Sequence, residues 1–159
     1  MKGSDKVIEQ LNEVLTAELT AINQYFIHSK MCKDWGYSRL AAHIYHESID
    51  EMKHADDLIE RILFLQGVPN VQRYNKITVG ETVKEQFELD LQMEYDAVDR
   101  FKKAIKVARD EERDETTGLM LERMLASEEE HVDWLETQLE LIKQVGLENY
   151  LSQQIHKGE

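Results

Sequence analysis

The sequence predicts an all-α fold, a bundle of four long helices with a long connection in its middle and a short fifth helix at the end. Apolar side chains recur at steps of three and four residues through four stretches, and no stretch alternates as a strand would. The chain contains one Pro and seven Gly, so long helices can run with few interruptions. Its 159 residues, 42% of them hydrophobic, are enough to bury one sizeable core, which predicts a single domain over residues 1–159.

Two long helices are predicted in the first half of the chain. The first extends to about residue 33, and Ser4 and Asp5 are both plausible capping residues for its beginning. The second covers about residues 38–65 and ends where Gly67 and Pro69 interrupt the helical pattern. Helices of about 28 residues would each be about 42 Å long.

The stretch between the second and third helices, residues 68–80, has a loop-like pattern with Asn70, Asn75 and Gly80. A connection of this length between helices is unusual in a compact domain. It is long enough to cross the length of a bundle, which would place the third helix parallel to the second.

Two further long helices and a short one are predicted in the second half. The third covers about residues 81–109 and is followed by a charged turn at residues 110–115. The fourth covers about residues 116–145 and ends at Gly146. Residues 147–155 then predict the short fifth helix.

The charge balance excludes some classes of protein. Lys and Arg total 19 against 32 Asp and Glu, a formal net charge of -13, which argues against nucleic-acid binding and suits a protein that attracts cations.

Cys32 is the only cysteine, so there is no intrachain disulfide and no cluster of thiolate ligands. No apolar run approaches the ~20 residues of a membrane span, and the N-terminus lacks the apolar core of a signal peptide. A cytoplasmic location is therefore expected.

Two copies of the pattern Glu-x-x-His occur, one in each half of the chain. Glu51 and His54 form the first, and Glu128 and His131 form the second. Residues three apart share a face of a helix, so each pair offers a carboxylate oxygen and an imidazole nitrogen to one point. One such pair is common, whereas two at matching positions indicate a shared site.

An internal repeat connects these pairs with two single glutamates on apolar helix faces. Glu18 precedes Glu51 by 33 positions, and Glu94 precedes Glu128 by 34. Each half of the chain therefore supplies one helix with a glutamate and one helix with Glu-x-x-His. Folded together, the halves would place four carboxylates and two imidazoles around a pseudo-two-fold axis.

Four buried carboxylates near one point repel one another and are costly unless cations compensate them. No Lys or Arg lies on the predicted inner faces near them, so two divalent metal ions are the expected compensation. Carboxylates bridge two metals well, and an imidazole on each favours iron, manganese or zinc over calcium. This is the arrangement known from dinuclear carboxylate bundles. The alternative is a set of ordinary surface Glu–His pairs, which the matched spacing disfavours.

Three stretches of the sequence resemble one known family. They are the opening, which ends in INQYF at residues 22–26, YHESIDEMKHAD at residues 45–56, and GLENYL at residues 146–151. Through these stretches the chain resembles the bacterioferritins along its whole length. The resemblance implies a ferritin-like four-helix bundle, with a long crossover between its second and third helices. It also implies a hollow cage of twenty-four identical or similar subunits that stores ferric mineral, and ferroxidase activity at a di-iron site within each subunit.

The resemblance also implies roles for the residues of the predicted site. Tyr25 lies two turns after Glu18 on the same helix face, and in the family a tyrosine there lies beside the metals. It would supply a hydrogen bond or an electron, and an ordinary core tyrosine is the alternative. The implied ligands are Glu18, His54 and bridging Glu51 for one iron, and Glu94, His131 and bridging Glu128 for the other.

Met52 follows Glu51 directly and so points about 100° away around the helix, which excludes it from the di-iron site. By itself it would be a packing or interface methionine. The resemblance instead implies a haem b between two subunits related by a two-fold axis, with this methionine from each as axial ligand. The residues that would line that pocket are Leu19, Asn23, Phe26, Tyr45 and Ile49.

His46 and Asp50 lie one turn apart on the second predicted helix. The resemblance implies that they form an inner-surface iron site used in core formation, and solvated polar residues are an equally good interpretation.

The leading interpretation is an iron-storage ferroxidase that oxidises Fe(II) to Fe(III) with O₂ or H₂O₂. The resemblance implies that haem assists the release of iron, with a small ferredoxin as electron donor, and it leaves open whether one or two types of chain build the cage. One alternative is a di-iron oxidase, a peroxidase or a di-manganese catalase that does not store iron. The other is a structural bundle whose carboxylates are solvated.

Overall fold

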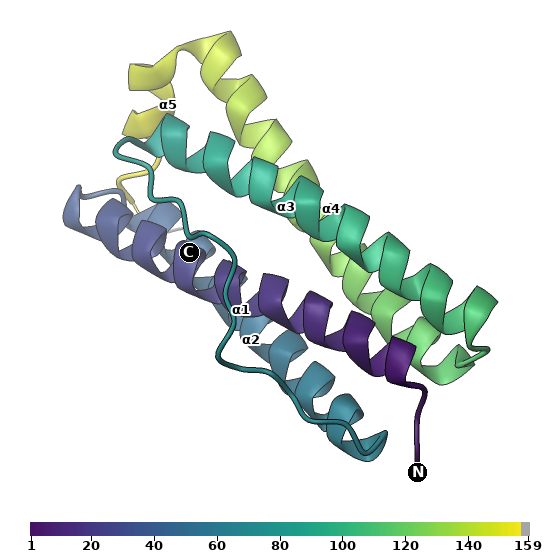
Figure 1. Ribbon diagram of the computed structural model, residues 1–159. Helices are drawn as coiled ribbons and strands as arrows, with labels where there is room; N and C mark the ends of the chain where they lie inside the picture. Colours follow the sequence, from purple (N-terminus) through teal and green to yellow (C-terminus); the bar gives the residue numbers. More distant parts are fainter. Residues whose placement is uncertain (157–159) are drawn as a thin grey trace.

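The computed structural model describes residues 1–156, which form five α-helices and no strand (Figure 1). In chain order the elements are α1 (Asp5–Asp34), α2 (Ser38–Phe64), α3 (Val83–Lys106), the π-helical turn η1 (Val107–Glu111), α4 (Glu115–Val145) and α5 (Leu147–Ser152).

The four long helices form a bundle of two antiparallel hairpins, α1 with α2 and α3 with α4 (Figure 1). The connection from α2 to α3 runs along the length of the bundle, so α3 starts at the end where α2 also starts and lies parallel to it. The predicted all-α bundle, with its long crossover and short fifth helix, is confirmed.

Four helix boundaries differ from the prediction. The Thr82 side chain accepts a hydrogen bond from Glu85 N, so α3 begins after Thr82 rather than at Glu81. Asp114 caps α4 in the same way, which starts that helix within the expected charged turn. The backbone of α3 widens into η1 after Lys106, and α5 ends three residues before the expected end.

The crossover is tied to α1 by a row of side chains spaced four residues apart. Asn70 N donates to Asn12 Oδ1 (2.8 Å), Asn75 N to Thr20 Oγ1 (2.9 Å) and Thr78 N to Gln24 Oε1 (3.1 Å). Arg73 Nε donates to Thr16 Oγ1 (3.1 Å), and Gly80 N to His28 Nε2 (3.0 Å). The row gives the backbone of an extended segment the partners that a helix or sheet would otherwise supply. The α1 members of the row are Asn12, Thr16, Thr20, Gln24 and His28.

The last member of this row, His28, also joins α1 to α3. Because its Nε2 accepts from Gly80 N, its Nδ1 carries the proton and faces Asp90 Oδ1 at 2.9 Å. Gln24 Nε2 donates to the same oxygen at 2.9 Å. Burial raises the pKa of Asp90, and the contacts with His28 and Gln24 oppose that rise. This buried network fixes the end of the crossover where α3 begins.

Replacing His28 with Ala is expected to lower the free energy of unfolding by about 3 kcal/mol. The change removes one of the partners of the buried Asp90 carboxylate and frees the backbone of Gly80. Urea unfolding followed by circular dichroism measures it, with His46→Ala, an exposed histidine on α2, as control. A loss no larger than that of the control would contradict the structural role given to His28.

The apolar core is divided into two clusters with a polar layer between them. One cluster lies where α1 begins and α2 ends, and includes Leu15, Leu58 and Phe101. The other lies toward α5, and includes Ile44 and Phe87. On each of the four long helices, the predicted metal ligands fall between the two clusters.

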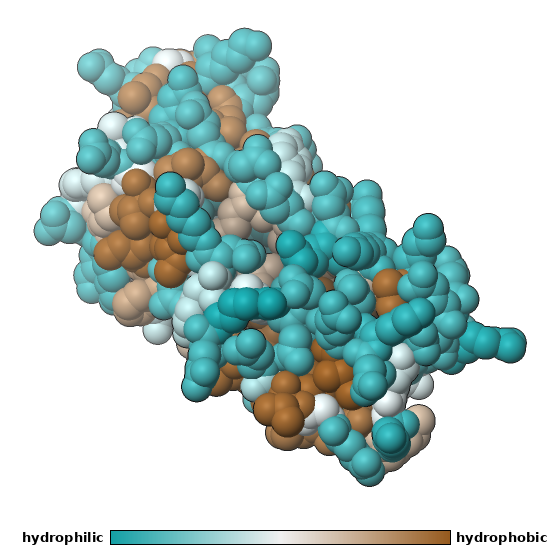
Figure 2. Space-filling view, viewed as in Figure 1, coloured by the Kyte–Doolittle hydropathy of each residue, from teal (hydrophilic) through white to brown (hydrophobic). Residues whose placement is uncertain are grey.

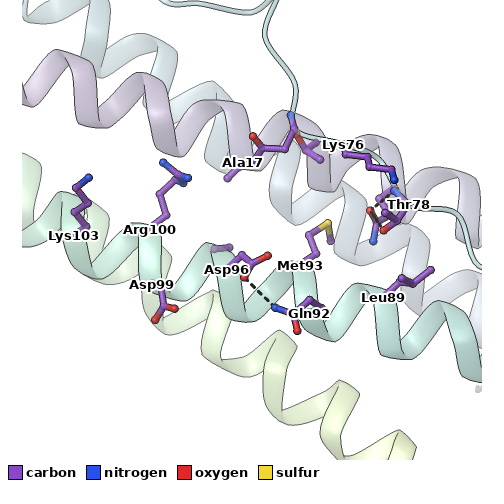
Figure 3. Close-up of a pocket in the computed structure, with 14 residues that line it drawn as sticks. Ala17, Lys76, Thr78, Leu89, Gln92, Met93, Asp96, Asp99, Arg100 and Lys103 are labelled. Carbon is purple, nitrogen blue, oxygen red and sulfur yellow. Dashed lines mark hydrogen bonds between the residues drawn. The ribbon is translucent and has the colours of Figure 1, made fainter.

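The surface shows apolar areas among charged ones. Figure 2 shows brown areas over the hairpin of α1 and α2 and its crossover, bordered by polar side chains. A surface pocket beneath the crossover, between α1 and α3, is lined by charges of both signs, including Asp96, Arg100 and Lys103 (Figure 3). None of the predicted metal ligands lines this pocket. No helix within residues 1–156 combines the length and the apolar character that crossing a bilayer requires.

Candidate metal centre

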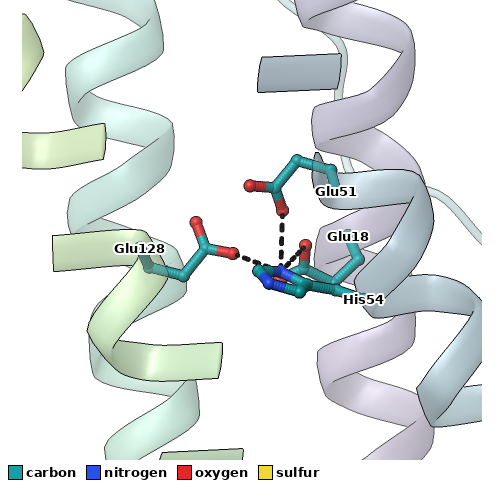
Figure 4. A group of neighbouring side chains, drawn as sticks. All are labelled: Glu18, Glu51, His54 and Glu128. Carbon is teal, nitrogen blue, oxygen red and sulfur yellow. Dashed lines mark hydrogen bonds and ion pairs between the residues drawn. The ribbon is translucent and has the colours of Figure 1, made fainter. Parts of the chain in front are cut away.

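The polar layer receives ligand-type side chains from all four long helices. The four glutamates are each no more than 1% exposed and His131 is 4% exposed. Figure 4 shows four members of the layer, with the His54 ring between three carboxylates. The layer as a whole contains Glu18 from α1, Glu51 and His54 from α2, Glu94 from α3, and Glu128 and His131 from α4.

The first half of the layer is centred on His54. Its Nδ1 lies 3.1 Å from Glu128 Oε1, 3.5 Å from Glu18 Oε2 and 3.7 Å from Glu51 Oε2. These four residues present one atom each within 4.8 Å of one another, which is close enough to hold a metal ion.

The second half is centred on His131. Its Nδ1 lies 2.9 Å from Glu51 Oε1, and 3.4 Å from both Glu94 Oε1 and Glu128 Oε2. These four residues also bring one atom each within 4.8 Å of one another.

Two glutamates belong to both halves. Glu51 presents Oε2 to His54 and Oε1 to His131, while Glu128 presents Oε1 to His54 and Oε2 to His131. Each of these carboxylates therefore spans the two imidazoles, whereas Glu18 faces only His54 and Glu94 faces only His131. This division between shared and unshared carboxylates follows from the geometry, and sequence spacing alone did not show it.

The charges of the layer are not balanced by basic side chains. Within residues 1–156, the four glutamates pair with histidines and with no Lys or Arg. Several buried atoms also make no hydrogen bond, namely Glu18 Oε2, both carboxylate oxygens of Glu51, Glu94 Oε2, Glu128 Oε2 and His131 Nδ1. Buried carboxylate oxygens without donors are the expected state of ligand atoms whose partner is a metal ion.

The carboxylates raise the proton affinity of the layer. Burial lowers the pKa of His54, but its contacts with the Glu128 and Glu51 carboxylates outweigh burial and raise it to about 10. The pKa of His131 is raised for the same reason. Burial, and then the charge of Glu128, raise the pKa of Glu94 well above its usual value. Protons therefore supply the compensating charge when no metal is bound.

Tyr25 lies at the edge of the second half. Its hydroxyl donates to Glu94 Oε1, and its ring meets the His131 ring edge-on with centroids 6.2 Å apart. Burial, followed by the charge of Glu94, raises the pKa of Tyr25 well above its usual value. The phenol is thus held protonated beside a candidate ligand.

Sequence reasoning missed one buried carboxylate, Glu47. It contacts His131 Nε2, and Asp50 Oδ2 lies 3.7 Å from the same nitrogen. Burial raises the pKa of Glu47, but contacts with His131 and His43 outweigh burial and lower it to about 2. Glu47 lies one turn before Glu51 on the same helix, and this spacing could have predicted that it lies near the site. The structure groups Asp50 with Glu47 and His131, while His46 is exposed and lies outside that group.

The residues expected around a haem lie on the outer face of the α1–α2 hairpin, away from the polar layer. Met52 is 50% exposed, Phe26 47% and Tyr45 42%, although all three are large and apolar or aromatic. The Phe26 and Tyr45 rings lie 6.4 Å apart. Asn23 is also exposed, and Leu19 and Ile49 are partly buried beside them.

Comparison with known proteins places this geometry in a family. Residues 8–145 match the ferritin family, described as a ferritin-like domain. The chain is 52% identical over 153 residues to the bacterioferritin BfrA of Mycobacterium tuberculosis, covering 96% of each chain. It is 48% identical over 159 residues to a bacterioferritin of Streptomyces coelicolor, covering 100% of this chain and 95% of the other. A bacterioferritin of Brucella melitensis is 47% identical over 150 residues, 94% of this chain and 92% of its own. The chain belongs to the bacterioferritins, within the ferritin family.

Proposed function

We propose that this protein is an iron-storage ferroxidase. It oxidises Fe(II) to Fe(III) at a dinuclear site within each subunit and stores the ferric product in a cage of twenty-four subunits in the cytoplasm. The observation that carries the proposal is the pair of glutamates, Glu51 and Glu128, that each present one oxygen to both imidazoles in a buried layer without basic partners. Membership of the bacterioferritins supports the storage part of the proposal.

The shared and unshared carboxylates define two places for the iron substrate. Glu51 and Glu128 would bridge both ions, Glu18 and His54 would complete one place, and Glu94 and His131 the other. Four negative charges favour Fe(III) over Fe(II), because the higher charge is better compensated. The hydroxyl of Tyr25 donates a hydrogen bond to Glu94 and so orients that carboxylate.

Two iron ions at one site match the electron count of the reaction. Each Fe(II) gives up one electron, so a pair reduces O₂ to H₂O₂ with the uptake of two protons. With H₂O₂ as the oxidant, the same two electrons and two protons cleave the O–O bond and yield two molecules of water. A single iron would supply only half of either requirement, which explains why the chain builds two places side by side.

Fe(II) added aerobically to the metal-free protein is expected to oxidise in a fast phase that saturates near two irons per subunit. A Glu128→Ala, His131→Ala variant is expected to lose that phase, because it lacks one bridge and one terminal ligand. Stopped-flow absorbance measures the oxidation, and electron microscopy follows the mineral. Equally slow oxidation by both proteins would favour the structural bundle, whereas a fast phase without particle growth would favour an oxidase or peroxidase that does not store iron.

A haem b between two subunits is the second part of the proposal. The exposed apolar face that carries Met52 would be covered by the same face of another copy across a two-fold axis. Each copy would then supply one thioether sulfur to the iron of the haem, within walls formed by Phe26 and Tyr45. Haem at this position would carry electrons toward the stored mineral, with a small ferredoxin as donor.

Met52→Leu is expected to abolish axial binding of haem while leaving the fold intact, because leucine matches methionine in size but has no ligand atom. Titration with haemin, followed by visible absorption, is expected to saturate near one haem per two subunits in the wild type. Met120→Leu, on α4, is the matched control. Unchanged haem spectra in Met52→Leu would rule out this methionine as the ligand.

A further inference from the structure

His131 is contacted on both sides of its ring. Its Nδ1 faces the metal layer, with Glu51 Oε1 at 2.9 Å, and its Nε2 contacts Glu47 on the opposite side. A carboxylate behind a ligating imidazole fixes the tautomer and the rotation of the ring. Glu47 is therefore placed to keep Nδ1, rather than Nε2, directed at the metal.

Glu47 is in turn held by a second histidine. It is 7% exposed, and its Oε1 lies 2.7 Å from the Nε2 of His43, one turn earlier on α2. His43 stacks on Trp134 with ring centroids 3.9 Å apart and planes 15° from parallel. Trp134 lies one turn after His131 on α4, so these contacts close a ring between the two helices. We name Glu47, His43 and Trp134 the positioning arm.

Trp134, the last residue of the positioning arm, is itself fixed by the core. The Phe87 ring, which is fully buried on α3, meets Trp134 edge-on with centroids 5.6 Å apart. Stacked and edge-on aromatic contacts restrict the rotation of the indole. His131 contacts Glu47, Glu47 contacts His43, and His43 stacks on Trp134. This series of contacts connects the orientation of His131 to a rigid part of the bundle.

The other imidazole of the polar layer, that of His54, has a different environment. Among the described residues, His54 makes its carboxylate contacts through Nδ1 alone. Its side chain is 13% exposed and lines a surface pocket with Asp57 and Arg123. The internal repeat thus relates the ligands of the two halves but not the groups behind them.

We propose that Glu47 and His43 are positioning residues that orient His131 and make its half of the site the tighter of the two. The proposal rests on the dinuclear site proposed above and adds an order of filling. A first divalent ion would bind between Glu94 and His131, and a second would bind between Glu18 and His54. Groups behind a ligating imidazole commonly change metal affinity by about 10–100-fold, which sets the expected difference.

Two double-substitution variants of the full-length chain each keep only one metal position, and we call them single-site variants. Glu18→Gln with His54→Gln keeps the His131 half, and Glu94→Gln with His131→Gln keeps the His54 half. Co(II) is added to each without oxygen, because its visible absorption reports both binding and ligand geometry.

His43→Ala is then introduced into both single-site variants. It is expected to weaken Co(II) binding by about 10–100-fold in the His131 half and to change its absorption bands. In the His54 half the change is expected to be less than about twofold. His43→Gln, whose amide can still donate to Glu47, is expected to restore most of the lost affinity.

Equal weakening in both halves would show that His43 acts through general packing, and no weakening in either would show that the arm does not orient His131. Either result would overturn the proposal. The wild type separates this failure from that of the proposed function. Two bound Co(II) per subunit without a selective effect of His43 would reject the arm alone, whereas no bound Co(II) would reject the dinuclear site as well.

Discussion

Glu51→Gln is expected to remove both metal positions, whereas Glu18→Gln is expected to remove only one. Glu51 contributes an oxygen to each half of the layer, while Glu18 faces only His54. The amide keeps the size of the side chain but removes the charge and one acceptor oxygen. We expect affinity for divalent metal to fall by more than about 100-fold at each affected position, since groups one layer further out already account for about 10–100-fold.

Anaerobic titration with Co(II) measures this difference as stoichiometry. The wild type is expected to bind two ions per subunit, Glu18→Gln one and Glu51→Gln none with comparable affinity. Both variants are expected to lose the fast phase of Fe(II) oxidation, because one iron cannot supply the electron pair. Loss of a single ion in both variants would show that Glu51 does not bridge. Glu88→Gln, an exposed glutamate on α3, should behave as the wild type.

The ligands could be predicted from the sequence because they follow local rules. Glu51 with His54, and Glu128 with His131, are neighbours on one helix face whatever the rest of the chain does. The repeat then indicated that the two halves meet. What the spacing did not give was which carboxylates are shared, because this depends on how α2 and α4 face one another across the bundle.

The tethers of the crossover and the positioning arm could not be predicted for a related reason. Thr16, Thr20 and Gln24 resemble ordinary polar residues on a helix, since their partners belong to a segment more than fifty residues away in the sequence. His43 and Trp134 likewise meet only after α2 and α4 pack. In other sequences, polar residues spaced four apart beside the apolar stripe of a helix, together with a long connection elsewhere in the chain, would predict such a row of hydrogen bonds.

The metal-free protein is expected to become less stable as the pH rises above neutrality. An unfolded histidine has a pKa of about 6.5, whereas the carboxylates around His54 raise its pKa to about 10 in the fold. Between these values the folded state binds more protons than the unfolded state, so the free energy of unfolding falls with pH. The stabilisation is fully present below about pH 6.5 and is lost as the pH approaches 10. Thermal unfolding at pH 6.5, 7.5 and 8.5 measures the decline.

Bound Zn²⁺ is expected to reverse this dependence. The metal takes the place of the proton on each imidazole, so it binds more tightly as the pH rises. At a free concentration of about 100 times its dissociation constant it would add about 2.7 kcal/mol to the free energy of unfolding. For a chain of this size that corresponds to about 5–10 °C in Tm.

Two histidine variants on α2 test whether the decline originates in the polar layer. His54→Gln is expected to make the metal-free pH dependence shallower, because it removes one of the groups that hold an extra proton in the fold. His46→Gln changes an exposed histidine on the same helix and is expected to leave it unchanged. If both variants declined as steeply as the wild type, the general negative charge of the chain would account for the effect. Repulsion among the surface carboxylates would then be what destabilises the metal-free protein as the pH rises. The pH dependence would no longer support a buried anionic layer that requires metal.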